Sequence, residues 1–136
     1  MIVFDQDSKL LAWAANVLKV RYEPKQCAWL SEISNEGEIQ AVVVYNRFSP
    51  YNCEMSVASN GGKKWFSRRA ARAWFGYPFN QMKLRRVTAV AESDNKRSID
   101  MLKVLGFVEE ATLKQWFGDK DGIVFRMTRS ECKWLT

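Results

Sequence analysis

The residues that could carry out chemistry in this sequence are carboxylates, hydroxyls, amides and cations, because none of its 136 residues is a histidine. Without histidine, the chain cannot assemble a Ser-His-Asp or Cys-His nucleophile or a His-ligated zinc site. The three cysteines, Cys27, Cys53 and Cys132, form no CxxC pair, so we expect no metal centre and no redox dithiol. Proton transfer must fall to a carboxylate, a tyrosine, a cysteine, a lysine or water.

One junction in the sequence is suited to binding a phosphate. A strand predicted over 53–58 leads through a loop with two glycines into a helix that begins near Trp65. Unpaired backbone N–H groups and the helix dipole favour an anion at such a helix start. Four cations surround it: Lys63, Lys64, Arg68 and Arg69. Because cations oppose the dipole, a bound polyanion would relieve their cost. A solvated basic helix face explains the same residues equally well.

The elements that position these residues follow from hydrophobic periodicity and turn residues. We expect helices over 8–21, 65–77 and 96–105, and strands over 27–33, 39–48, 53–58, 87–91, 109–117 and 122–129. Pro24 limits the first helix, Pro78 stops the second and Gly106 caps the third. The order α-β-β-β-α-β-α-β-β, without repeat or linker, predicts one α/β domain over 1–136 with a mixed sheet and helices on both faces.

The composition is that of a soluble globular protein, with 47% hydrophobic and 26% charged residues. Its formal net charge of +6 suggests an anionic partner such as nucleic acid, a phosphorylated cofactor or an acidic substrate. No apolar run approaches the ~20 residues that cross a bilayer, so no membrane partner is expected. The N-terminus does not resemble a signal peptide, and the odd cysteine count favours a reducing compartment. We therefore expect a cytoplasmic protein.

The six tryptophans divide into two groups. Trp13, Trp29 and Trp74 fall at core-facing positions of their elements, which predicts a packing role. Trp65 and Trp116 do not, and we interpret them as candidates to line a cofactor or substrate groove. Aromatic residues beside basic ones also occur in single-strand nucleic-acid sites.

The segment from Asn95 to Glu110 resembles the C-terminal motif of the GNAT acyltransferase superfamily. In that motif an asparagine opens the helix, a small residue (here Ser98) follows three positions later, and the helix closes on a Gly-Phe pair, here Gly106-Phe107. The stretch Tyr77-Pro78-Phe79-Asn80 and the later Arg85-Arg86-Val87-Thr88-Ala89 resemble the branch acting on ribosomal-protein N-termini and related amines. The resemblance extends over about residues 27–129.

The resemblance implies a mostly antiparallel sheet and transfer of an acetyl group from acetyl-CoA to a primary amine by direct attack, without an acyl-enzyme. The strand over 53–58 would diverge from that over 87–91, and the pantetheine arm of the cofactor would enter the gap. Backbone amides near Val57 to Ser59 would pair with the arm and polarise the thioester carbonyl. The implied cofactor-binding residues are Val57, Ala58, Ser59, Lys63, Lys64, Trp65, Phe66, Ser67, Arg68 and Asn95.

The sequence departs from the family at two places. The pyrophosphate loop Gln/Arg-x-x-Gly-x-Gly/Ala falls on residues 62–67, where Gly62 replaces the leading residue and Trp65 and Ser67 replace the two small ones. The tyrosine that many members use as general acid falls on Leu102.

Three residues are therefore candidates for proton transfer. Ser98 is the nearest hydroxyl that could donate a proton to the leaving thiolate, although a serine there is commonly a helix-start hydrogen-bonding residue. Glu54 is our first choice as general base, because it alternates away from the apolar positions of its strand beside the acyl group that the resemblance implies. Glu92, at the end of the opposing strand, is the second choice. Both carboxylates are equally compatible with ordinary exposed acids.

Other functions remain open at this stage. The main alternative is a GNAT-fold protein that has lost catalysis and binds nucleic acid or protein. A weaker one is a basic structural subunit of a ribonucleoprotein or virion. The amine acceptor could be a protein N-terminus, a lysine or a small molecule. Assembly as a homodimer is also open.

Overall fold

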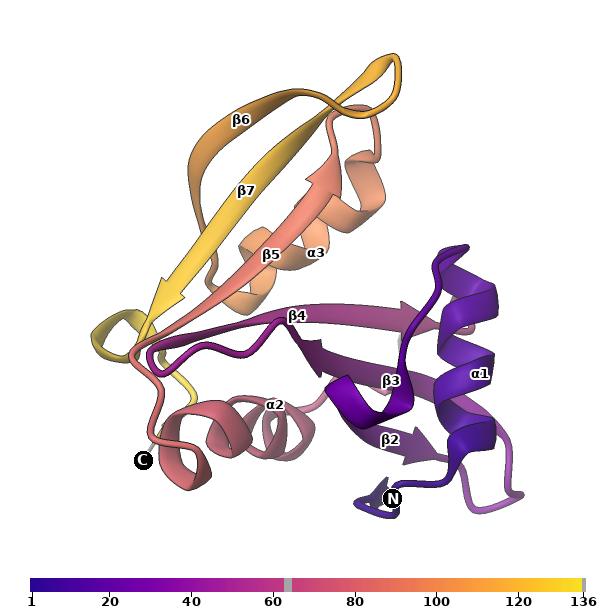
Figure 1. Cartoon of the computed structure of the whole chain (residues 1–136). Helices are drawn as coiled ribbons and strands as arrows, with labels where there is room; N and C mark the ends of the chain where they lie inside the picture. Colours follow the sequence, from indigo (N-terminus) through magenta and orange to yellow (C-terminus); the bar gives the residue numbers. More distant parts are fainter. Residues whose placement is uncertain (63–64, 136) are drawn as a thin grey trace.

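The structure, a computed structural model, describes residues 1–62 and 65–135. The helices are α1 (Ser8–Leu18), α2 (Arg68–Gly76) and α3 (Lys96–Leu105), and the strands are β1 (Ile2–Val3), β2 (Ala28–Ile33), β3 (Ile39–Asn46), β4 (Asn52–Ser59), β5 (Arg86–Glu92), β6 (Val108–Phe117) and β7 (Lys120–Thr128). Their order confirms the predicted one and adds the short β1 (Figure 1).

The strands form one sheet in the order β1-β2-β3-β4-β5-β7-β6. Every neighbouring pair is antiparallel except β4 and β5, which confirms a mixed, mostly antiparallel sheet. The parallel pair is short, because only 52–54 of β4 pair with 86–88 of β5. The pairing ends at Glu54 and Thr88. Beyond these residues β4 and β5 run in different directions, as Figure 1 shows. The sheet is therefore split at its centre.

Helices cover both faces of the sheet, as predicted. Alternate residues of β3 point to opposite faces. Val42 and Val44 pack in one core with α1, whereas Val43 and Tyr45 pack in the other core with α2 and α3. Both cores are closed, since all four β3 side chains are fully buried. None of the helices in the described ranges is long and apolar enough to span a membrane.

Three helix boundaries differ from the prediction. Helix α1 ends at Leu18 rather than 21, because Lys19 adopts a left-handed cap (φ 57°) whose N–H bonds to the carbonyl of Ala15. Helix α2 begins at Arg68 rather than near 65, because Ser67 supplies the N-cap. Pro78 does not stop the chain from coiling, since the wider turn Tyr77–Gln81 follows directly. Proline fits the start of such a turn, where its missing N–H is not needed.

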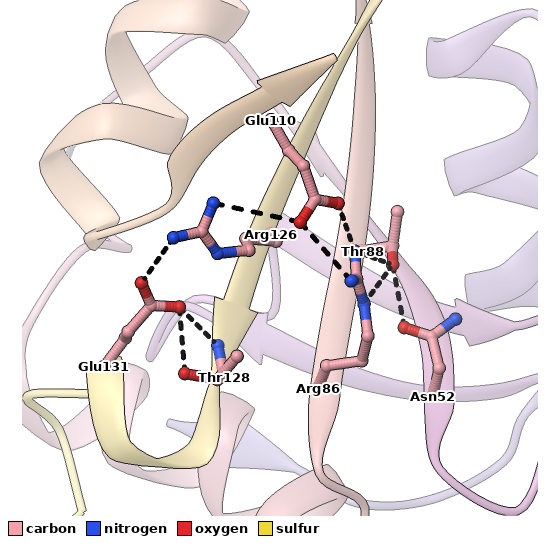
Figure 2. Close-up of polar contacts among 7 residues, drawn as sticks. All are labelled: Asn52, Arg86, Thr88, Glu110, Arg126, Thr128 and Glu131. Carbon is pink, nitrogen blue, oxygen red and sulfur yellow. Dashed lines mark hydrogen bonds and ion pairs between the residues drawn. The ribbon is translucent and has the colours of Figure 1, made fainter.

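A polar network joins the strands where β4 and β5 still pair (Figure 2). The Thr88 hydroxyl donates to Asn52 Oδ1 at 2.7 Å, and Arg86 donates both to Thr88 and to Glu110, the latter at 2.8 Å. Arg126 lies 3.8 Å from Glu110 and 3.0 Å from Glu131. The contacts run from β4 to β5, from β5 to β6, and from β6 to β7. They hold the strands together at the closed end of the split.

Replacing Glu110 with glutamine is expected to lower stability in a pH-dependent way. The hydrogen bond from Arg86 lowers the pKa of Glu110, so its contribution is complete above pH 4.5, its ordinary pKa, and is lost as pH falls through the lowered value. Because the carboxylate is about one-third exposed, solvent screening limits the loss to about 1 kcal/mol. Urea unfolding of the wild type and Glu110→Gln at neutral and acidic pH measures the difference, and a difference that persists at acidic pH would contradict this.

Candidate functional site

The diverging edges of β4 and β5 carry backbone groups without a strand partner. One residue beyond β4, the Asn60 N–H donates to the Gln40 carbonyl of the β3 side at 3.0 Å. Hydrogen-bonded and non-bonded pairs alternate along antiparallel strands. Ala58 therefore directs its peptide group to β3, whereas Val57 and Ser59 direct theirs to the edge that faces the split. Two of the three amides predicted for cofactor binding face the gap, and Ala58 is removed from that set.

The start of α2 adds donors at the open end of the split. The Ser67 hydroxyl accepts from the N–H of Ala70 at 3.0 Å and so caps the helix. The N–H groups of Arg68 and Arg69 lie in the first turn, where a helix offers no internal acceptor. Both arginine side chains are exposed. Lys63 and Lys64, predicted to bind the cofactor, lie outside the described residues.

Trp65 lies in the core, so its interpretation as a groove residue was wrong. Its indole is 6% exposed, stacks on Trp74 with ring centroids 5.2 Å apart, and donates to the Gly62 carbonyl at 2.7 Å. Phe66 is 36% exposed and lies edge-on between Trp65 and Trp134. Trp65 and Phe66 therefore anchor the chain just before α2 by packing on other aromatic side chains. Trp116 is exposed, as a groove residue would be.

The start of α3 faces the same end of the split. Asn95 is the N-cap, and its Oδ1 accepts from the Ser98 N–H at 3.1 Å, which leaves the Asn95 NH₂ group as a donor. Arg97 donates to the Gly61 carbonyl at 2.6 Å and so connects α3 to the loop after β4. Sequence reasoning missed Arg97. Its position was a usable signal, because a cation in the first turn opposes the helix dipole unless it has a partner.

Glu54 lies at the point where the strands part, on the face covered by α1. It shares that face with Ala58, four residues along β4, which packs in the α1 core. Its carboxylate is 29% exposed and lies 3.1 Å from Arg47 Nε. Glu92 lies four residues beyond Thr88 on β5, about 13 Å along the strand at 3.3 Å per residue. Of the two candidate bases, Glu54 is the one at the point where β4 and β5 separate.

Tyr22 and Cys53 are the other titratable groups next to Glu54. Burial raises the pKa of the Tyr22 phenol, its hydrogen bond with Ser56 lowers that pKa, and the charge of Glu54 raises it. Burial raises the pKa of Cys53 to about 12, with a further contribution from Glu54. The Cys53 thiol is fully buried and protonated at neutral pH, so it is not a nucleophile.

A surface pocket opens beside Arg47, the residue that contacts Glu54. It has a volume of about 850 Å³ and is lined by two segments, one after α1 that includes Tyr22 and one after β3 that includes Asn46 and Arg47. Asn46 pairs directly with Glu54 across the strands. A molecule in this pocket would reach the carboxylate from the α1 face, while the starts of α2 and α3 lie on the opposite side of the sheet.

Neither protein-family models nor curated protein sequences match this chain. Solved structures do. The chain is similar to ribosomal-protein-S5-alanine acetyltransferase from Vibrio fischeri, with 22% identity over 93% of this chain and 72% of that one and a TM-score of 0.66. It is also similar to spermidine/spermine N-acetyltransferase SpeG from Vibrio cholerae (13% identity, 96% and 92% covered, TM-score 0.77) and to a GNAT-family acetyltransferase from Bacillus anthracis (18%, 93% and 85%, 0.66).

Proposed function

The chain has the fold of the GNAT acetyltransferases, and from this premise we propose that it transfers an acetyl group from acetyl-CoA to a primary amine. The observation that carries the proposal is the position of Glu54. A partly exposed carboxylate stands where β4 and β5 separate, with backbone donors along the gap on one side and a pocket on the other. A general base is needed at the meeting point of an acyl donor and an amine.

The residues that face the gap fit an acyl-CoA. The Val57 and Ser59 peptide groups lie along the open β4 edge and would pair with the amides of the pantetheine arm. The Asn95 NH₂ group would bond the arm from the α3 side. The first-turn N–H groups of α2, with Arg68 and Arg69, would hold the pyrophosphate. Because backbone N–H groups would bind the pyrophosphate, the bulky Trp65 at a motif glycine is compatible with pyrophosphate binding.

The protein's own contribution to the reaction is to orient the amine and manage its protons. Glu54 takes one proton from the ammonium group, and the free amine then attacks the thioester carbonyl carbon. A carbon–nitrogen bond forms, the carbon–sulfur bond breaks, and a backbone N–H of the open β4 edge polarises the carbonyl. The sulfur leaves as the CoA thiolate and gains a proton from water, and water also takes the second proton that the nitrogen releases. Ser98, in the first turn of α3, lies at the open end of the split, away from Glu54. The protonated Cys53 supports direct attack without an acyl-enzyme.

Acetyl-CoA is expected to stabilise the folded protein. A ligand present at 100 times its dissociation constant adds about 2.7 kcal/mol, which for a domain of this size raises Tm by about 10 °C. Thermal unfolding with acetyl-CoA, CoA, ATP and a short oligonucleotide measures this. We expect similar shifts with acetyl-CoA and CoA and a smaller one with ATP.

The same experiment tests the main alternative. A nucleic-acid-binding module would ignore the thioester and be stabilised by the oligonucleotide, with a shift that falls steeply as salt rises. That pattern would overturn the transferase proposal. Turnover is then followed as CoA release with a panel of amines: amino acids, diamines and short peptides.

A further inference from the structure

We propose that the pocket beside Glu54 takes an α-amino acid, with its amino group on Glu54 and its carboxylate on Arg47 and Arg21. The inference rests on the proposed function, since it names the class of acceptor for the same site. It draws on the pocket's lining residues, which belong to two segments that the sequence analysis did not connect.

The contact between Arg47 and Glu54 indicates where an ammonium group would sit. The Arg47 Nε lies 3.1 Å from a Glu54 carboxylate oxygen, so a cation already occupies the position that the acceptor nitrogen needs. The Arg47 side chain is otherwise 68% exposed. An incoming ammonium group would replace Arg47 on Glu54 and release the guanidinium for an anion that arrives on the same molecule. Arginine binds a carboxylate through two parallel hydrogen bonds.

The backbone supports a dedicated role for Arg47. Its φ is 51°, in the left-handed region that residues with a Cβ rarely adopt. Strained backbone of this kind clusters at ligand sites, where the fold holds a side chain in one direction. Here the strained turn follows β3 and directs Arg47 to the carboxylate on β4.

Arg21 gives the pocket a second cation, from the segment after α1. The acidic residue of that segment, Glu23, caps the turn Pro24–Gln26, where it accepts from the Lys25 N–H at 3.4 Å. Two guanidinium groups disfavour a diamine, whose second ammonium group they repel, and favour an acceptor that carries a negative charge. This separates the pocket from one built for polyamines.

The geometry selects α-amino acids among the amines with a carboxylate. Once the ammonium group has displaced it, the Arg47 guanidinium stays next to Glu54, because the two residues come from neighbouring positions of paired strands. The two ligand groups that they bind are therefore neighbours, as the amino and carboxylate groups of an α-amino acid are. The aromatic rings of Tyr22 and Phe48 line the same pocket and offer contact to an apolar side chain. Phenylalanine and leucine are therefore suitable probes.

The test measures binding without acetyl-CoA. Amide chemical shifts of the isotope-labelled protein are followed while phenylalanine, phenethylamine (no carboxylate) or 3-phenylpropionate (no amine) is added, and leucine and isopentylamine form a second pair. We expect the amino acid to bind about 10- to 100-fold more tightly than its amine and to shift residues of the pocket. Arg21→Gln removes this preference without touching the Glu54 contact, and Arg47→Gln also removes it. Arg72→Gln, an exposed arginine of α2, is the matched control and retains it.

Equal affinities for the amino acid and its amine, a preference for the amine, or no binding of either amino acid would overturn the inference. Its failure is distinguishable from failure of the proposed function. Stabilisation by acetyl-CoA together with turnover of another amine would retain the transferase and reject the amino-acid pocket. Arginine-dependent binding of phenylalanine without any response to acetyl-CoA would retain the pocket and reject acetyl transfer.

Discussion

Replacing Glu54 with glutamine is expected to lower kcat about 10²- to 10⁴-fold, the usual contribution of a positioned general base. Glutamine has the same shape but cannot take a proton from the ammonium group. The side chain is partly exposed and its ion pair with Arg47 is screened, so the variant should lose at most about 1 kcal/mol of stability. Stabilisation by acetyl-CoA should not change, because Glu54 lies on the face of the sheet away from the proposed donor site.

The measurement is CoA release with the best amine of the panel, beside thermal unfolding with and without acetyl-CoA. Glu36→Gln, in the exposed turn between β2 and β3, is the matched control and should retain full activity. A fully active Glu54→Gln would contradict the assignment. If Glu92→Gln lost activity instead, the base would lie at the open end of the split, about 13 Å further along β5.

Sequence periodicity predicted the order and approximate bounds of the helices and strands but not the side-chain contacts between them. Alternation of apolar and polar residues in β4 and the caps of α3 are local features, because Asn95 and Gly106 act within one turn of their own helix. Those elements were predicted within one or two residues. The start of α2 was local too. Ser67 is a good N-cap residue, but the apolar Trp65 and Phe66 extended the apparent helical face and concealed it.

The residues around Glu54 show where local reasoning stops. Tyr22 reaches Ser56 across 34 positions of sequence, and Arg47 reaches Glu54 because β3 and β4 pair with Asn46 opposite Glu54. Neither pair has a periodic or spacing signature. Glu54 itself was found because it alternates with the apolar residues of its strand, a pattern that is visible within one strand. Its partners follow only from how β3, β4 and the segment after α1 pack.

Burial of Trp65 is likewise a tertiary effect. Trp65 stacks on Trp74, which is nine residues further along the chain. This contact depends on the turn before α2, which sequence periodicity did not predict. The family motif has a glycine at this position to let the pyrophosphate approach the backbone. In this chain the indole turns inward instead and stacks on Trp74 in the core, so the Trp65 side chain itself does not block the approach of a ligand. The departure from the motif thus has a structural explanation consistent with a retained donor site.

Proline substitutions in β4 are expected to separate cofactor binding from folding, since the direction of each N–H is fixed by the pairing with β3. Val57→Pro removes an N–H that faces the split and puts the proline ring in the path of the pantetheine arm. Ala58→Pro removes an N–H that bonds to β3 in a residue only 1% exposed. We expect Val57→Pro to fold, with acetyl-CoA affinity at least about 10-fold lower, and Ala58→Pro to lose about 3 kcal/mol or more.

Urea unfolding measures the stability of both variants, and titration with acetyl-CoA measures affinity. If Val57→Pro is too unstable to titrate, Ser59→Pro tests the same edge at the end of the strand, where a proline is better tolerated. Unchanged acetyl-CoA affinity in a folded variant at either position would mean that the open edge of β4 does not hold the donor. The hydrogen bond from Asn60 to Gln40 fixes the alternation along β4, so the N–H groups of Val57 and Ala58 point in opposite directions. A general weakening of β4 would therefore not lower acetyl-CoA affinity in one variant and stability in the other.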